Sequence, residues 1–115
     1  MSKRRDQDYL NDIGEAIQRI TAYTMEMTYE DFLADPKTQD AVVRNLEIIG
    51  EATKNLSIQW RKTHSQIQWK DLAGMRDKMI HHYFGLNYEI VWTIIKEELP
   101  KLLSRVKILL AKKLK

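Results

Sequence analysis

The sequence has no cysteine among its 115 residues, and it has only four glycines and two prolines. The absence of cysteine excludes a disulfide framework, an iron–sulfur cluster, a thiolate zinc site and a cysteine nucleophile. The scarcity of glycine and proline leaves few positions for tight turns, which favours long helices over many short strands. A chain of this length can bury a hydrophobic core, so we expect residues 1–115 to form a single domain.

Long apolar runs are also absent from the sequence. No window approaches the ~18 consecutive apolar residues that indicate a membrane span, and residues 1–6 lead into polar sequence rather than a signal-peptide core. We therefore expect a cytoplasmic protein with no membrane partner. The net charge of +3 permits nucleic-acid binding but does not identify it. Basic residues concentrate at 3–5 and 101–115, and such runs are usually solvated faces or frayed ends.

Apolar residues at three- and four-residue steps predict the first two helices. The first spans about residues 6–28, and a connector with space for one helical turn follows at residues 29–34. Asp35-Pro36 is a helix start signal, because a capping Asp is followed by Pro at the first helical position. The second helix then runs to about Leu56. Gly50 inside it lowers helix propensity, so we interpret it as a point of close helix packing.

Two further helices are predicted after a polar connector at residues 57–68, in which His64 is expected at the surface. The third helix spans about residues 69–84 and the fourth residues 88–98. Pro100 cannot continue the fourth helix without a kink, but it can begin a last helical segment. The predicted fold is therefore all-α: an antiparallel four-helix bundle whose last helix is broken near Pro100.

The residues best suited to chemistry lie within one short segment that contains Arg76, His81, His82 and Tyr83. Arginine carries a permanent charge and a fork of donors that matches a phosphate. Histidine exchanges a proton near neutral pH. Because RNA carries its own nucleophile, the 2′-hydroxyl, a base and a cation can suffice for strand cleavage without a metal. The sequence also lacks a carboxylate cluster of the two-metal type.

Helical geometry constrains how these residues could meet. Arg76 and Tyr83 share a face of a continuous helix, but Arg76 and His81 lie about 140° apart around the axis. Either the helix loosens near His81, or the arginine side chain bends across, or a second subunit completes the site. Asp77 shares a face with His81 and could orient its imidazole. Residue types alone also fit a solvated helix edge, with Tyr83 packed in the core.

The run Arg76, four residues, His81, one residue, Tyr83 resembles the signature of HepT-like toxins of the HEPN superfamily. The surrounding sequence is similar as well, from about Tyr9 to Leu110. The segments that carry the resemblance besides the motif are residues 46–52, 67–78, 83–87, 90–92 and 99–100. The resemblance identifies the whole chain as a single HEPN domain.

The resemblance implies a helical bundle that forms a homodimer or higher oligomer, with the Arg–His motifs of both subunits lining one cleft. It implies a metal-independent ribonuclease, without a cofactor, that acts on RNA of its own host, with tRNA among the targets. The implied partner is an MNT-type nucleotidyltransferase antitoxin that transfers AMP from ATP to Tyr83. His82 lies at a spacing from Arg76 that the superfamily also tolerates, but the His-x-Tyr arrangement favours His81.

The sequence therefore predicts an endoribonuclease toxin of a type VII-like HEPN/MNT toxin–antitoxin pair. Arg76 and His81 are the predicted catalytic residues, Tyr83 the modified residue, and Asp77 and His82 supporting residues. One alternative is a non-catalytic HEPN regulatory or binding partner of a nucleotidyltransferase. Another is a plain helical interaction domain, which would be favoured if Arg76 and His81 were buried in separate salt bridges.

Overall fold

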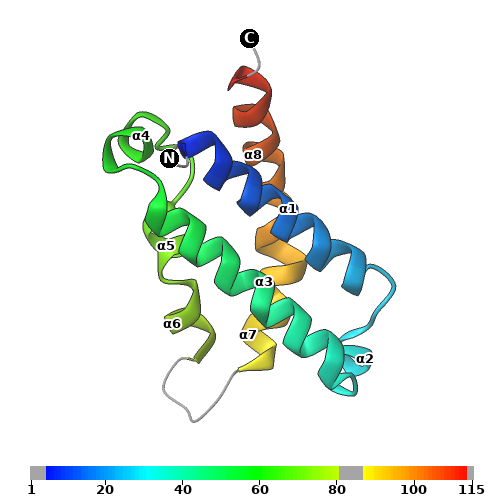
Figure 1. The fold of residues 1–115 in the computed structure, drawn as a ribbon. Coiled ribbons are helices and arrows are strands. Elements are labelled where there is room, and N and C mark those ends of the chain that lie inside the picture. Colours follow the sequence, from blue (N-terminus) through cyan, green and yellow to red (C-terminus); the bar gives the residue numbers. More distant parts are fainter. Residues whose placement is uncertain (1–4, 81–86, 114–115) are drawn as a thin grey trace.

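The computed structural model describes the backbone of residues 5–80 and 87–113, and this part of the chain is helical without a β-strand (Figure 1). The predicted all-α fold is therefore confirmed. In chain order the elements are α1 (Asp6–Thr24), α2 (Tyr29–Leu33), α3 (Pro36–Asn55), α4 (Ile58–Thr63), α5 (Trp69–Ala73), α6 (Met75–Ile80), α7 (Tyr88–Thr93), the π-helical turn η1 (Ile94–Glu98) and α8 (Leu99–Lys113). None of the helices described is long and apolar enough to cross a membrane.

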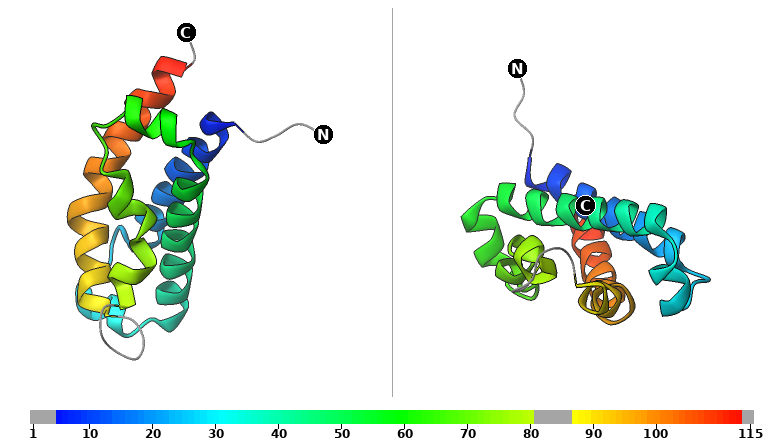
Figure 2. Two further views of the ribbon diagram at one scale, coloured as in Figure 1. Left: turned by 90° about the vertical axis from the view of Figure 1, so that its left-hand side faces the viewer. Right: turned by 90° about the horizontal axis from the view of Figure 1, so that it is seen from below.

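The helices form two layers. The antiparallel pair α1 and α3 makes one layer, and the other contains α5 with α6 beside the path through α7, η1 and α8 (Figure 2). The layers meet where α8 packs on α1 and where α5 and α6 pack on α3. Because α5–α6 and α7–α8 also run in opposite directions (Figure 1), the arrangement is the predicted antiparallel bundle.

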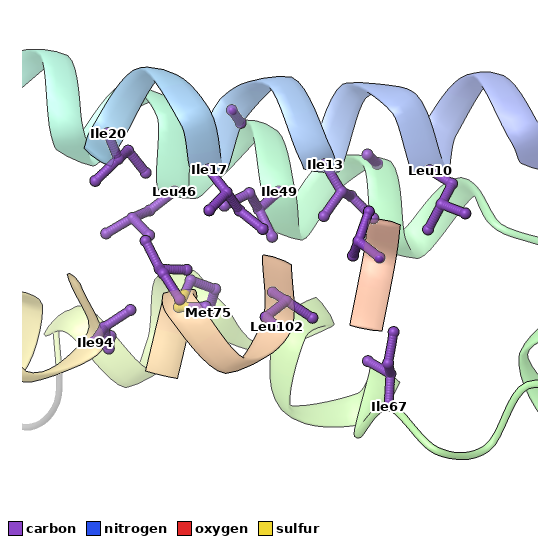
Figure 3. Close-up of a cluster of buried hydrophobic side chains, with 14 of the residues drawn as sticks. Leu10, Ile13, Ile17, Ile20, Leu46, Ile49, Ile67, Met75, Ile94 and Leu102 are labelled. Carbon is purple, nitrogen blue, oxygen red and sulfur yellow. The ribbon is translucent and has the colours of Figure 1, made fainter. Parts of the chain in front are cut away.

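The core fills the space between the two layers. Figure 3 shows apolar side chains of α1 and α3 directed toward those of the second layer. The labelled side chains, all buried, are Leu10, Ile13, Ile17, Ile20, Leu46, Ile49, Ile67, Met75, Ile94 and Leu102. The four from α1 recur at three- and four-residue steps, so the periodicity seen in the sequence is the core-facing stripe of this helix.

The first half of the chain follows the prediction closely. The carboxylate of Asp35 caps α3, accepting hydrogen bonds from the backbone N–H and the hydroxyl of Thr38 at 3.1 and 2.8 Å. Both bonds lower the pKa of Asp35 below its usual value, and the bond from the hydroxyl has the larger effect. The connector before α3 contains its own short helix, α2, which buries Phe32. Helix α1 ends at Thr24, four residues earlier than expected.

The connector at 57–68 is more ordered than the sequence indicated. It contains α4, whose N-terminus is capped by the Ser57 hydroxyl accepting from the Trp60 N–H at 3.2 Å. The prediction of His64 at the surface was wrong, since the residue is half-buried. Its ring stacks on that of Trp60 with centroids 4.0 Å apart, and its Nδ1 lies 2.8 Å from the Trp60 carbonyl oxygen. The connector is a packed corner rather than an irregular loop.

The prediction of one continuous helix from Trp69 was also wrong. The chain forms α5 and α6 instead, separated at Gly74, whose φ of −90° and ψ of 16° leave the helical region. The Gly74 N–H closes α5 by donating to the Lys70 carbonyl at 3.1 Å. The last four residues of the predicted helix, 81–84, lie outside the described residues.

The predicted break near Pro100 takes the form of the π-helical turn η1. The Leu99 N–H donates to the carbonyl of Ile94, five residues back, instead of to the fourth residue back. Proline has no N–H to donate, and its ring clashes with the carbonyl four residues earlier in a regular α-helix. The wider turn accommodates this defect, so the chain stays helical from α7 to α8.

Gly50 is a point of close packing, as the sequence indicated. A Cβ built on it would lie 3.3 Å from the carbonyl oxygen of Leu72 and 3.7 Å from the Cβ of Met75. The α5–α6 junction therefore rests directly on the backbone of α3 at this position. A side chain here would push the two layers apart.

We expect Gly50→Val to lower the free energy of unfolding by about 1–3 kcal/mol, because the added methyl groups overpack the contact with the Leu72 carbonyl. Urea denaturation measures this change. The control is Gly74→Ala, whose added Cβ meets no atom closer than 3.6 Å. It should change stability by no more than about 0.5 kcal/mol. A Gly50→Val variant as stable as the control would contradict the close approach.

Candidate functional site

Arg76 lies in the first turn of α6, next to a residue that fixes this helix to the core. The preceding Met75 is 2% exposed and packs between the layers, whereas the Arg76 side chain is 72% exposed. Adjacent helix positions point about 100° apart, so burying Met75 turns Arg76 outward. The backbone of Arg76 is therefore fixed while its guanidinium faces solvent.

The guanidinium of Arg76 has a loose ionic contact. Its Nε lies 3.9 Å from an Oε of Glu47 on α3, and the Glu47 side chain is 36% exposed. A contact of this length in solvent stabilises a protein by about 0–1 kcal/mol. Arg76 is thus not buried in a salt bridge, so the observation that would favour a plain interaction domain is not met at this residue. The arginine can exchange Glu47 for another anion at little cost.

A hollow of about 420 Å³ extends from Arg76 between α1, α3 and the α5–α6 junction; we call it the Arg76 hollow. Its lining residues are Tyr9, Asp12, Arg44, Glu47, Ile48, Gly50, Glu51, Ala52, Lys54, Asn55, Ala73 and Arg76. Its charges are mixed, with three carboxylates and three basic side chains. Away from Arg76, the electrostatic field of this hollow therefore does not strongly favour an anion.

The remaining predicted site residues are placed only in part. Asp77 is exposed on α6, beside Arg76. His81, His82 and Tyr83 lie outside the described residues, so their distances to Arg76, and the expected contact of Asp77 with His81, stay predictions. Within the described ranges, the residue that contacts the Arg76 guanidinium is Glu47, which the sequence analysis had not selected.

Sequence reasoning missed the α3 side of the Arg76 hollow. Arg44, Glu47, Glu51 and Lys54 follow one another at steps of three or four residues and so line one face of α3. This spacing is visible in the sequence, but it is typical of any solvated helix face. Only the packing of α6 against α3 shows that this face borders Arg76.

Among residues 5–80 and 87–113, no group of three or more His, Asp or Glu side chains is placed to hold a metal ion.

Comparison with known families identifies the chain. The family model described as "Ribonuclease HepT-like" matches residues 13–109, which is most of the sequence. The chain belongs to the HepT-like ribonuclease family. The resemblance seen in the sequence is confirmed, and the matched range includes the motif at 76–83 that carried it. No solved structure matches the chain significantly.

Individual relatives agree with the family match. The chain is 51% identical over 100 residues to the "Probable ribonuclease HepT" of Thermococcus cleftensis, covering 87% of this chain and 91% of the relative. It is 48% identical over 100 residues to a "Putative RNase" of Methanocaldococcus jannaschii, covering 87% and 83%. A "Putative RNase" of Caldanaerobacter subterraneus is 47% identical over 104 residues, covering 90% and 93%. This HepT-like chain thus aligns with nearly the full length of each relative.

Proposed function

We propose that this HepT-like chain is a metal-independent endoribonuclease and the toxin of a type VII-like HEPN/MNT toxin–antitoxin pair. It would cleave RNA of its own host, with tRNA among the targets. Family membership supports the ribonuclease activity. The structural observation that carries the proposal is Arg76, an arginine on a core-anchored helix whose side chain is 72% exposed. Such a residue can bind a phosphate without first breaking a buried contact.

In the proposed reaction, the guanidinium of Arg76 binds the non-bridging oxygens of the scissile phosphate and stabilises their charge as it grows. His81 accepts the proton of the 2′-hydroxyl, and the oxygen attacks the adjacent phosphorus. The bond to the 5′-oxygen breaks, and this oxygen takes up a proton. The products are a 2′,3′-cyclic phosphate and a 5′-hydroxyl. Asp77 would orient the imidazole, and His82 is the alternative base.

The proposed site is shared between two subunits. Arg76 is on the outer surface of α6, and on a regular helix a residue five positions later, such as His81, would point about 140° away. A homodimer that brings two α6 helices together would place the Arg76 of one subunit near the His81 of its partner. We therefore propose a homodimer or higher oligomer as the active form.

We expect Arg76→Ala and His81→Ala each to lower the rate of RNA cleavage in EDTA by about 10²–10⁴-fold, because one removes the phosphate clamp and the other the base. Gel analysis of a labelled RNA measures the rate. Arg19→Ala is the matched control, since Arg19 is also exposed and paired with one carboxylate, Glu15, at 3.4 Å. It should cleave like the wild type.

Arg76→Ala should keep the wild-type melting temperature within a few degrees, because an exposed side chain has little packing to lose. We expect the same of His81→Ala. Loss of cleavage in His82→Ala but not in His81→Ala would identify His82, rather than His81, as the general base. A wild-type protein that binds its nucleotidyltransferase but cleaves no RNA would favour the non-catalytic alternative.

For the assembly, we expect sedimentation at micromolar concentration to give a dimer or a larger species, because a site completed by a partner needs stable association. Mixing Arg76→Ala with His81→Ala protein should restore part of the cleavage, since a mixed dimer retains one intact pair. A strict monomer that cleaves RNA would refute the shared site.

The toxin would be silenced by AMP transfer to Tyr83. The phenol oxygen attacks the α-phosphorus of ATP in the partner enzyme, pyrophosphate leaves, and the phenol proton passes to solvent. The new phosphodiester would pair with Arg76 by charge-assisted hydrogen bonds and occupy the place of the RNA phosphate. We expect intact-mass analysis after incubation with the nucleotidyltransferase and ATP to show adenylylation of wild type but not of Tyr83→Phe. An adenylyl mass increase that persists in Tyr83→Phe would place the modification elsewhere.

A further inference from the structure

The positive charge of the chain is concentrated in two stretches that contain no acidic residue. Residues 52–70 and 99–115 together hold ten of the 19 Lys and Arg residues and none of the 16 Asp and Glu residues. The rest of the chain therefore carries a net negative charge. The overall net charge of +3 does not reveal this uneven distribution of charge along the chain.

The fold brings the two acid-free stretches into contact. An Nη of Arg105 on α8 donates to the carbonyl oxygen of Gln66, in the connector between α4 and α5, at 3.2 Å. Ile67 and Gln68 of the connector line a second hollow together with Leu102 and Arg105 of α8. Figure 1 shows α4 and the last turns of α8 at the same end of the molecule. Basic side chains of both stretches therefore gather at this end, beside two carboxylates of the second hollow and that of Asp6 at the α4 cap.

A shallow hollow of about 430 Å³, largely open to solvent, lies between α4 and α5; we call it the basic hollow. Its lining residues are Ile58, Arg61, Lys62, Ser65, Ile67, Gln68, Trp69, Lys70 and Ala73. Three of these are cations and none is a carboxylate, in contrast to the mixed Arg76 hollow.

Among the residues that the structure describes, the cations of the basic hollow have no anionic partner. Lys62 and Lys70 are exposed, and none of the three cations forms an ion pair with any residue that the structure describes. The Nε of Arg61 is buried without a hydrogen-bond partner there. Unpaired donors around a concave surface favour a polyanion.

The basic hollow adjoins the Arg76 hollow. Ala73, the last residue of α5, lines both of them. A bound chain that leaves Arg76 would therefore reach the basic hollow past the end of α5.

We infer that the basic hollow binds the phosphodiester backbone of single-stranded RNA beyond the scissile phosphate. This inference rests on the proposed ribonuclease function. Lys62 and Lys70 neutralise backbone phosphates, and the side chains of Ser65 and Gln68 supply further donors. Ile58 is 65% exposed at the rim, where it can cover the face of a base. The shared wall at Ala73 favours RNA over an acidic protein segment, because the RNA must also reach Arg76.

The test compares two variants that each remove two positive charges, both in a His81→Ala background that prevents cleavage. Lys62→Gln/Lys70→Gln alters the basic hollow, and Arg19→Gln/Lys37→Gln alters exposed cations on α1 and α3. Fluorescence anisotropy measures the binding of a single-stranded RNA of about 16 nucleotides, the upper end of common site sizes, over a series of salt concentrations.

We expect the slope of log affinity against log salt to fall by about 1.4 for Lys62→Gln/Lys70→Gln, since each contact with a single strand contributes about 0.7. The control should keep the wild-type slope. An unchanged slope in the first variant, or an equal loss in the control, overturns the inference. Polyglutamate that displaces the labelled RNA as effectively as unlabelled RNA does would also overturn the inference, because it would indicate a site for acidic protein.

Cleavage assays with His81 intact separate this inference from the proposed function. Lys62→Gln/Lys70→Gln should raise the KM for the RNA oligomer several-fold, leave its kcat unchanged, and leave the cleavage of a dinucleotide unaffected. A wild-type protein that cleaves neither substrate refutes the proposed function, whereas the binding slopes still test the basic hollow. A variant that loses dinucleotide cleavage would show that Lys62 or Lys70 acts at the scissile phosphate, contrary to the inference.

Discussion

The close approach of α3 to the α5–α6 junction at Gly50 is the contact on which the rest of the structure depends. With no side chain at Gly50, the carbonyl of Leu72 and the side chain of Met75 can rest on the backbone of α3. This contact fixes the start of α6 and buries Met75. The exposure of Arg76 is a consequence of that burial, because the next residue of the helix must point away. A packing requirement in the core thus places the cation at the surface.

The sequence contained enough information to predict the long helices but not the short ones. Helices α1 and α3 each extend over several turns, so their apolar stripes are unambiguous, and Asp35-Pro36 marks the start of α3. Helix α4 has only six residues, too few to show a helical period. Its stability comes from tertiary contacts: the Ser57 N–H and hydroxyl donate to the Asp6 carboxylate of α1 at 2.8 and 2.9 Å. No local pattern reveals a partner so distant in sequence.

The same limit applies to the candidate site. Arg76 could be selected from the sequence because its residue type and its distance from His81 follow a motif. The surroundings of Arg76 could not, because Glu47 and Lys54 belong to a polar helix face like many others until α6 packs beside it. The Gly74 break was also missed, since a single glycine within an apolar pattern is compatible with either a continuous or an interrupted helix. Residues that are distant in sequence form the hollow, and only their packing reveals it.

The π-helical turn η1 has a consequence for the orientation of the helices that flank it. A turn of this kind contains one residue more than the α-helical turn it replaces, which shifts the angular phase of all later residues by about 100°. The apolar stripe of α8 is therefore rotated relative to that of α7. Helix α7 contacts α6, while α8 contacts α1 across Gly14, where Val106 packs. The continuous helix from α7 to α8 thus packs against two neighbours on different sides. Deleting one residue from η1 would bring the apolar stripes of α7 and α8 back into phase.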